Sequence, residues 1–223
     1  MPIPDNTTFG SMEDGSGITY GQVRKIIDPN RQIQLLKLRL DTFLINQINE
    51  LTLKDEKKNL KVWSPFPLTI LTLLSIETLG HIICDIDKIK EENTFERSKI
   101  IVTPIYKLMA SELGYKPSKK FYEAFEKLHG KADKKSIQKY SDVIHKYQRN
   151  TFNHGYQAKG VYIDHEIQKP WIINESGGFL VVNPYLFWLR FKEVFEEVFQ
   201  NVLSNTNKEW RKNSINYFRK LID

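Results

Sequence analysis

The chain has 223 residues, of which 40% are hydrophobic and 27% charged, a composition typical of a folded globular protein that excludes an intrinsically disordered one. Its formal net charge of +6 favours an anionic partner, although a basic protein need not bind nucleic acid. Cys84 is the single cysteine, which excludes an internal disulfide and a zinc site built on paired cysteines, so we expect a cytoplasmic protein.

The beginning of the chain is polar and rich in glycine, serine and aspartate. It lacks the basic head and apolar run of a secretory signal, and we expect residues 1–28 to form a flexible arm in which Ile18 to Ile27 can form a short strand. The most apolar segment, Phe66 to Ile86, is long enough to be considered as a membrane span. It carries Glu77, His81 and Asp85, which would be costly in lipid, so we expect a buried helix and no membrane partner.

Helical patterns occupy most of the chain after this arm. Asp28 and Pro29 are residue types that cap and open a helix, and Asn183 with Pro184 repeats that signal near the C-terminus. Between the caps, apolar residues recur at helical spacing. The expected helices cover, in chain order, about 29–51, 64–89, 94–113, 118–128, 136–155, 184–203 and 208–222.

A different pattern precedes the last two helices. Short apolar runs at 161–163, 171–173 and 179–182 alternate with turn residues, and Gly177 with Gly178 suits a tight turn. We expect a small antiparallel hairpin over about 161–182. The predicted fold class is a mostly α-helical bundle with this small β-hairpin inserted before its C-terminal helices, and residues 29–223 are expected to form a single domain.

The most informative stretch is the octapeptide at 149–156, which reads Arg-Asn-Thr-Phe-Asn-His-Gly-Tyr at the end of a predicted helix. Arginine keeps its proton and can hold phosphoryl oxygens, whereas histidine titrates near neutral pH, so Arg149 with His154 suits phosphodiester chemistry. On an ideal helix the two side chains would point about 140° apart. The glycine that follows favours a loosened last turn, in which Asn150 and Asn153 can orient the imidazole.

A purely structural role for the same residues stays open at this point. An arginine near a helix C-terminus and a histidine before a glycine can bind the last carbonyl groups and favour the helix dipole. In that case Arg149 and His154 would stabilise a helix end and carry no chemistry.

The octapeptide resembles the active-site motif of HEPN domains, all-helical modules found in prokaryotic toxins, antiviral defence proteins and RNA-processing nucleases. The resemblance covers the predicted helices between residues 29 and 156. It implies an HEPN-like bundle and a metal-independent endoribonuclease that needs no cofactor. His154 would act as general base or general acid, Arg149 would stabilise charge at phosphorus, and Asn150 would assist. The products would carry a 2′,3′-cyclic phosphate and a 5′-hydroxyl.

The resemblance also implies partners. HEPN proteins commonly dimerise so that two motifs line one cleft, which implies a homodimer, or a heterodimer with another HEPN protein, acting on RNA as a toxin or antiviral effector. Tyr156 matches the tyrosine of two-gene toxin–antitoxin systems, which implies an antitoxin or nucleotidyltransferase partner. The alternative function is a non-catalytic helical module that binds RNA or a partner protein.

Residues outside the octapeptide are candidates for supporting roles. We expect Glu77 to face Arg149 and orient its guanidinium group. Glu77, His81 and Asp85 share one helix stripe, but a single helix supplies too few ligands, so no metal site is expected. His145 lies one turn before Arg149 and is expected to be structural. Four lysines on the approach to the motif are candidates for RNA binding, unless they are simply solvated: Lys134, Lys135, Lys139 and Lys146.

Overall fold

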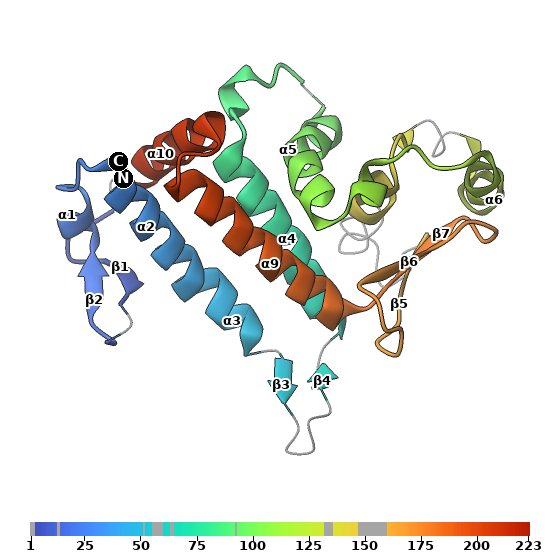
Figure 1. Ribbon diagram of the computed structural model, residues 1–223, viewed down its shortest axis with the longest axis horizontal. Helices are drawn as coiled ribbons and strands as arrows, with labels where there is room; N and C mark the ends of the chain where they lie inside the picture. The colour runs from blue at the N-terminus through green and yellow to red at the C-terminus, as the bar shows by residue number, and fades with distance from the viewer. Residues whose placement is uncertain are drawn as a thin grey trace.

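A computed structural model of the chain describes residues 3–12, 14–50, 52–54, 60–62, 65–91, 93–131, 136–146 and 160–223. These residues form a mostly helical protein with small sheets at its edges (Figure 1), which confirms the predicted mostly α fold class. The helices labelled in Figure 1 are α1 Tyr20–Val23, α2 Pro29–Leu40, α3 Asn46–Asn49, α4 Pro65–Ile83, α5 Thr94–Met109, α6 Lys119–His129, α9 Pro184–Leu203 and α10 Lys208–Ile222. Residues 140–146 are also helical.

Two helices, α2 and α9, begin where the capping residues in the sequence predict. The Asp28 carboxylate accepts a hydrogen bond from the Arg31 backbone N–H at 2.9 Å, and Pro29 is the first residue of α2. The Asn183 side chain likewise accepts from the backbone N–H groups of Tyr185 and Leu186 at the start of α9. Caps act within one turn of the chain, so the sequence alone is sufficient to place them.

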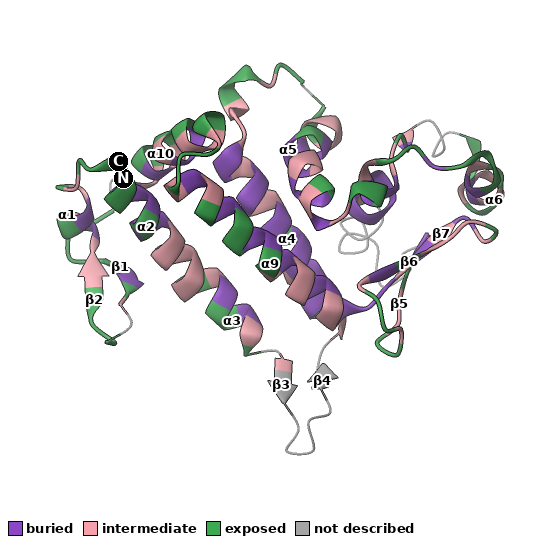
Figure 2. Ribbon diagram, viewed as in Figure 1, coloured by how far each residue is buried: buried purple, intermediate pink, exposed green. Residues whose placement is uncertain are grey.

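α4 and α9 lie side by side in the middle of the bundle, with α2 and α3 on one side and α5 on the other (Figure 1). α4 is mostly buried, whereas α9 buries one face and leaves the other partly exposed (Figure 2). The aromatic face of α9 is part of the core: Phe187, Trp188, Phe191, Phe195 and Phe199. Among the described residues, α4 is the one helix long and apolar enough to cross a membrane, but 61% of its apolar window is buried inside the protein. It is therefore the expected core helix.

α4 and α5 approach each other closely at Gly80. A Cβ atom built on Gly80 would lie 2.5 Å from the Ile101 carbonyl oxygen, which is backbone and cannot rotate away. We therefore expect Gly80→Ala to lower the free energy of unfolding by about 1–3 kcal/mol, as overpacked cores do. Urea denaturation measures this loss. Gly17→Ala is the control, because the nearest atom to its new Cβ lies 3.8 Å away. Equal losses in both variants would contradict the close helix contact.

The N-terminal residues do not form the expected flexible arm. β1 (Thr8–Ser11) and β2 (Gly17–Thr19) pair in antiparallel fashion, and α1 follows them. Phe9 and Tyr20 are buried, and the Arg39 guanidinium group of α2 lies over both rings, 5.0 Å and 5.4 Å from their centroids. The Phe9 ring also packs edge-on against Phe218 of α10. The expectation was wrong because these aromatic side chains give a polar segment enough apolar surface to bury.

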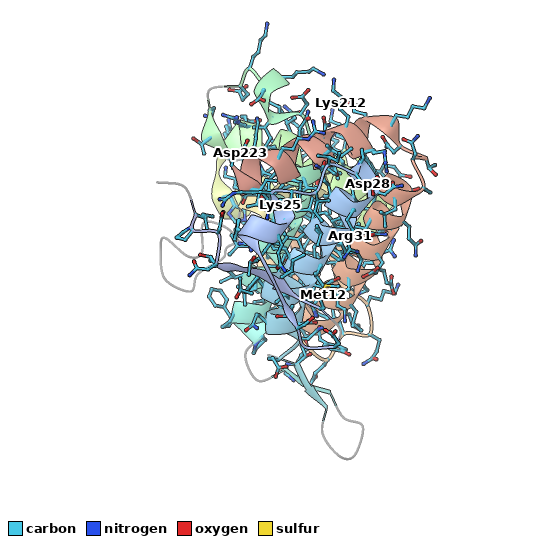
Figure 3. All side chains as sticks on the ribbon, turned by 90° about the vertical axis from the view of Figure 1, so that its left-hand side faces the viewer. Met12, Lys25, Asp28, Arg31, Lys212 and Asp223 are labelled. Atoms are coloured by element: carbon cyan, nitrogen blue, oxygen red, sulfur yellow. The ribbon has the colours of Figure 1, made fainter. Side chains whose placement is uncertain are left out.

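The two ends of the chain lie close together beside α2 and α10. Arg24 donates hydrogen bonds to the carbonyl oxygens of Ile3 and Ile222, both at 2.8 Å. Figure 3 looks onto this end of the molecule and labels Asp28 at the start of α2 and Asp223 at the end of α10. Arg24 therefore links the beginning of the chain to the end of α10.

The sheet before α9 differs from the predicted hairpin. β6 (Trp171–Asn174) and β7 (Phe179–Val182) form the expected antiparallel pair. β5 (Val161–Ile163) pairs with the other edge of β7 in parallel, so the strand order is β5-β7-β6. The prediction was wrong for β5 because a pattern of alternating residues fixes neither the partner nor the direction of a strand. A further hairpin, β3 (Thr52–Lys54) with β4 (Leu60–Val62), was not predicted.

Phe43 and Ile100 fall at the helical spacing of the apolar residues in the sequence, which predicts that they are buried, but both are exposed. Phe43 lies in a π-helical turn, Asp41–Ile45, between α2 and α3, and the wider turn rotates it out of the stripe. Ile100 is 49% exposed, because the inward face of α5 is formed by its neighbours Ile101 and Val102.

Candidate functional site

The octapeptide lies outside the described residues. The predicted site residues concerned are Arg149, Asn150, Asn153, His154 and Tyr156, together with Lys134 and Lys135. Before the motif, the described residues end at Lys146 on a helix, and they resume at Gly160. The geometry around this helix is therefore what the structure contributes to the site.

The helix over 140–146 is buried along nearly its whole length. Residues 140–145 are all buried, including the predicted core residues Tyr140, Val143 and Ile144. The helix begins later than the predicted Ser136, because the Asp142 carboxylate accepts hydrogen bonds from the backbone N–H groups of Gln138 and Lys139 at 2.7 Å and 3.0 Å. These bonds hold the entering segment as a turn.

A buried lysine ties this turn to α5. The Lys99 ammonium group donates to the Ser136 carbonyl oxygen and to a Glu96 carboxylate oxygen, both at 3.0 Å, and lies 3.6 Å from the Asp142 carboxylate. Lys99 and Asp142 are 7% and 3% exposed. A buried charge pair of this kind is strongly destabilising to break, so Lys99 fixes where the helix starts.

Three polar side chains form a hydrogen-bonded chain between α4, α5 and this helix. The Ser98 hydroxyl donates to the Glu77 carboxylate at 2.8 Å, and the same oxygen lies 2.8 Å from Nε2 of His145. We call Glu77, Ser98 and His145 the relay. Ser98 and His145 are each 3% exposed, whereas Glu77 is half-buried. The last residue of the relay, His145, comes four residues before Arg149 in the sequence.

The relay determines which imidazole nitrogen carries a proton. A carboxylate can only accept, so the single hydroxyl proton of Ser98 is directed to Glu77. The Ser98 oxygen must then accept from His145, which requires the Nε2–H form of the imidazole. The Phe95 ring stacks on the same imidazole, with centroids 5.9 Å apart and planes 19° apart. Hydrogen bonding and stacking together fix both the tautomer and the orientation of the ring.

Sequence patterns predicted only part of the relay. Glu77 was predicted to support the site, and it does lie in this polar chain, while its predicted contact with Arg149 concerns a residue outside the described part. Ser98 was missed, because a serine on an amphipathic helix carries no distinguishing signal. The spacing of His145 from Arg149 was a signal, although we expected His145 to be structural.

Tyr106 brings an unpaired hydroxyl close to the relay. Its side chain is buried, and its hydroxyl oxygen has no hydrogen-bond partner among the described residues. Burial, with smaller contributions from the charges of Glu77 and Asp142, raises the pKa of Tyr106 above its usual range, so the phenol stays neutral.

We expect Tyr106→Phe to raise the free energy of unfolding by about 1 kcal/mol, because it removes a buried hydroxyl that gains nothing from hydrogen bonding. Tyr140→Phe is the matched control. The Tyr140 hydroxyl accepts from the Ser118 backbone N–H at 3.1 Å and donates to Glu175, so its loss should destabilise by about 1–2 kcal/mol. Urea unfolding of both variants measures the difference, and a destabilised Tyr106→Phe protein would contradict the unpaired hydroxyl.

The described candidate lysines contact the protein itself. Lys146 donates to the Ser136 hydroxyl at 2.6 Å, and Lys139 lies 3.5 Å from the Thr103 hydroxyl. Lys139 lines a hollow of about 230 Å³ between α5 and the turn that precedes the helix, together with Lys99 and Asp142. Both lysines are half-buried, and neither contact in itself indicates RNA binding.

The stripe of Glu77, His81 and Asp85 does not act as one group. Glu77 binds Ser98, whereas His81 and Asp85 line a cavity of about 40 Å³ beside α10 together with Cys84. Burial raises the pKa of the Cys84 thiol to about 11. Among the described residues there is no group of three histidine, cysteine or carboxylate side chains placed to hold a metal ion.

Comparisons with protein-family models, with curated proteins and with solved structures give no match for this chain. The functional interpretation therefore depends on the octapeptide and on the geometry of the helix that precedes it.

Proposed function

We propose that this chain is a metal-independent endoribonuclease of the HEPN type. The observation that carries the proposal is the octapeptide at 149–156, in which an arginine and a histidine come shortly after the described helix over 140–146 in the sequence. The described part of that segment, 140–146, is buried and anchored by Lys99, Asp142 and the relay. A firmly held helix is a suitable support for groups that must be placed within a fraction of an ångström.

The proposed reaction is attack of a ribose 2′-hydroxyl on the adjacent phosphorus. The bond from the 2′-oxygen to phosphorus forms, and the bond from phosphorus to the 5′-oxygen of the next nucleotide breaks. His154 takes the proton of the 2′-hydroxyl or gives one to the leaving oxygen, while Arg149 stabilises the negative charge that develops on the phosphoryl oxygens. Asn150 and Asn153 orient the imidazole, and no metal or cofactor takes part.

The fold and the surroundings of the motif support this proposal in several ways. The mostly helical architecture is compatible with an HEPN-like bundle. The Glu77 carboxylate belongs to the relay, whose last member, His145, comes four residues before Arg149 in the sequence. The net charge of +6 favours approach of RNA.

The remaining parts of the proposal concern partners. The enzyme acts in the cytoplasm as a homodimer, with two motifs in a composite cleft, and serves as a toxin or antiviral effector. Lys134, Lys135, Lys139 and Lys146 assist in holding RNA, and Tyr156 is the position that a nucleotidyltransferase partner would modify.

Incubation of the purified protein with end-labelled RNA in EDTA tests the proposed function. We expect fragments that end in a 2′,3′-cyclic phosphate and begin with a 5′-hydroxyl, identified by mass spectrometry. An oligodeoxynucleotide of the same sequence should stay intact, because it has no 2′-hydroxyl. Stable RNA that is bound but not cut would instead favour the non-catalytic binding module.

A further inference from the structure

We propose that the relay of Glu77, Ser98 and His145 is a positioning device for the active site, with His145 as its positioning residue. This inference rests on the proposed function, because it assigns a role to residues that act on Arg149 and His154. His145 and Ser98 are each 3% exposed and cannot meet a substrate, so neither is a catalytic residue. Any effect of Ser98 and His145 on catalysis must therefore be transmitted through the residues that follow His145.

The relay is more polar than a helix contact requires. Burying a serine and a histidine in a bundle core is costly unless every polar atom is paired, and apolar side chains of similar size would fill the space at least as well. Here the two bonds of 2.8 Å pair these atoms along one line from a half-buried carboxylate to the imidazole. A paired polar chain specifies a single arrangement, which apolar contacts do not.

The relay fixes the position of the last described helical turn before the motif. His145 is held on one edge by Ser98 and on one face by the Phe95 ring, so neither rotation nor tautomer exchange is open to the imidazole. His145 comes four residues before Arg149 in the sequence. Loss of the relay should therefore loosen the start of the motif and leave RNA binding nearly unchanged, which lowers kcat more than it changes KM.

Ser98→Ala tests this inference against Ser214→Ala as the matched control. Ser214 is also fully buried on a helix, but within the described part of the chain its hydroxyl has no partner, so its removal should change neither activity nor fold. We expect Ser98→Ala to lower kcat by about ten- to hundredfold with KM within about twofold, since small misplacements of reacting groups have effects of this size. Nitrogen NMR of isotope-labelled histidine should show the Nε2–H form of His145 in the wild type and a loss of that single form in Ser98→Ala.

Glu77→Leu removes the oxygen that accepts the Ser98 hydroxyl proton and is the second variant should Ser98→Ala fail to fold, whereas Glu77→Gln would keep an acceptor oxygen. Glu77→Leu should lower kcat in the same direction. Full activity of a folded Ser98→Ala or Glu77→Leu protein, beside an inactive Arg149→Ala, would overturn the relay and leave the nuclease standing. An inactive wild type would overturn the nuclease and the positioning role together, and the NMR result would still report whether the relay fixes the tautomer.

Discussion

Replacing Arg149 with alanine should lower kcat for RNA cleavage by about a hundred- to thousandfold, the loss typical of removing one group that stabilises transition-state charge. Arg149→Lys should recover only part of the rate, because an ammonium group keeps the charge but not the two-pronged donor geometry of guanidinium. His154→Ala should lose at least about a hundredfold, since proton transfer then depends on water. Initial rates on a single RNA, with kcat and KM separated, measure all three changes.

Control variants distinguish a catalytic loss from a general effect of removing charge. Arg219 and His165 are exposed and lie outside the octapeptide, on α10 and between β5 and β6. Arg219→Ala and His165→Ala should both keep a rate within about twofold of the wild type, as surface changes usually do. If Arg149→Ala cleaves RNA as fast as Arg219→Ala, the motif has only the structural role of capping a helix end.

Replacing Lys99 with methionine should lower the free energy of unfolding by about 3 kcal/mol, the largest stability loss that we predict for a charge. The change leaves the buried Asp142 carboxylate without its ammonium partner and the Ser136 carbonyl oxygen without its donor. Asp142 keeps two backbone N–H donors, which limits the loss. Urea unfolding followed by circular dichroism measures the change.

Lys37→Met is the matched control for Lys99→Met. Lys37 pairs with Asp41 at 2.8 Å and Glu196 at 3.0 Å, but its side chain is 25% exposed, so water can solvate both carboxylates after the change. We expect a loss of less than about 1 kcal/mol. A Lys99→Met protein no less stable than Lys37→Met would show that the buried pair does not anchor the turn before the motif.

Local signals in the sequence predicted the helices well. The bounds expected from Asp28 with Pro29 and from Asn183 with Pro184 agree with α2 and α9, because a cap and the turn that it closes are only a few residues apart. The expected end of the first helix near residue 51 also agrees with α3, which ends at Asn49. Mostly helical architecture followed from these elements.

Such local signals could not predict contacts between residues that are far apart in the sequence. The parallel pairing of β5 with β7 and the packing of Phe9 against Phe218 depend on how the chain returns on itself. The same holds for the relay, in which Ser98 bridges side chains from two other helices. For the site itself, the sequence indicated Glu77 and the octapeptide, and the structure added Ser98, His145 and Lys99 around the preceding helix.

The most direct measurement is a side-by-side incubation of one end-labelled RNA in EDTA with the wild type, Arg149→Ala and His154→Ala. All three should unfold at the same urea concentration. We predict that the wild type alone produces fragments with 2′,3′-cyclic phosphate ends. Equal cleavage by all three, or none by a folded wild type, would contradict a metal-independent ribonuclease built on Arg149 and His154.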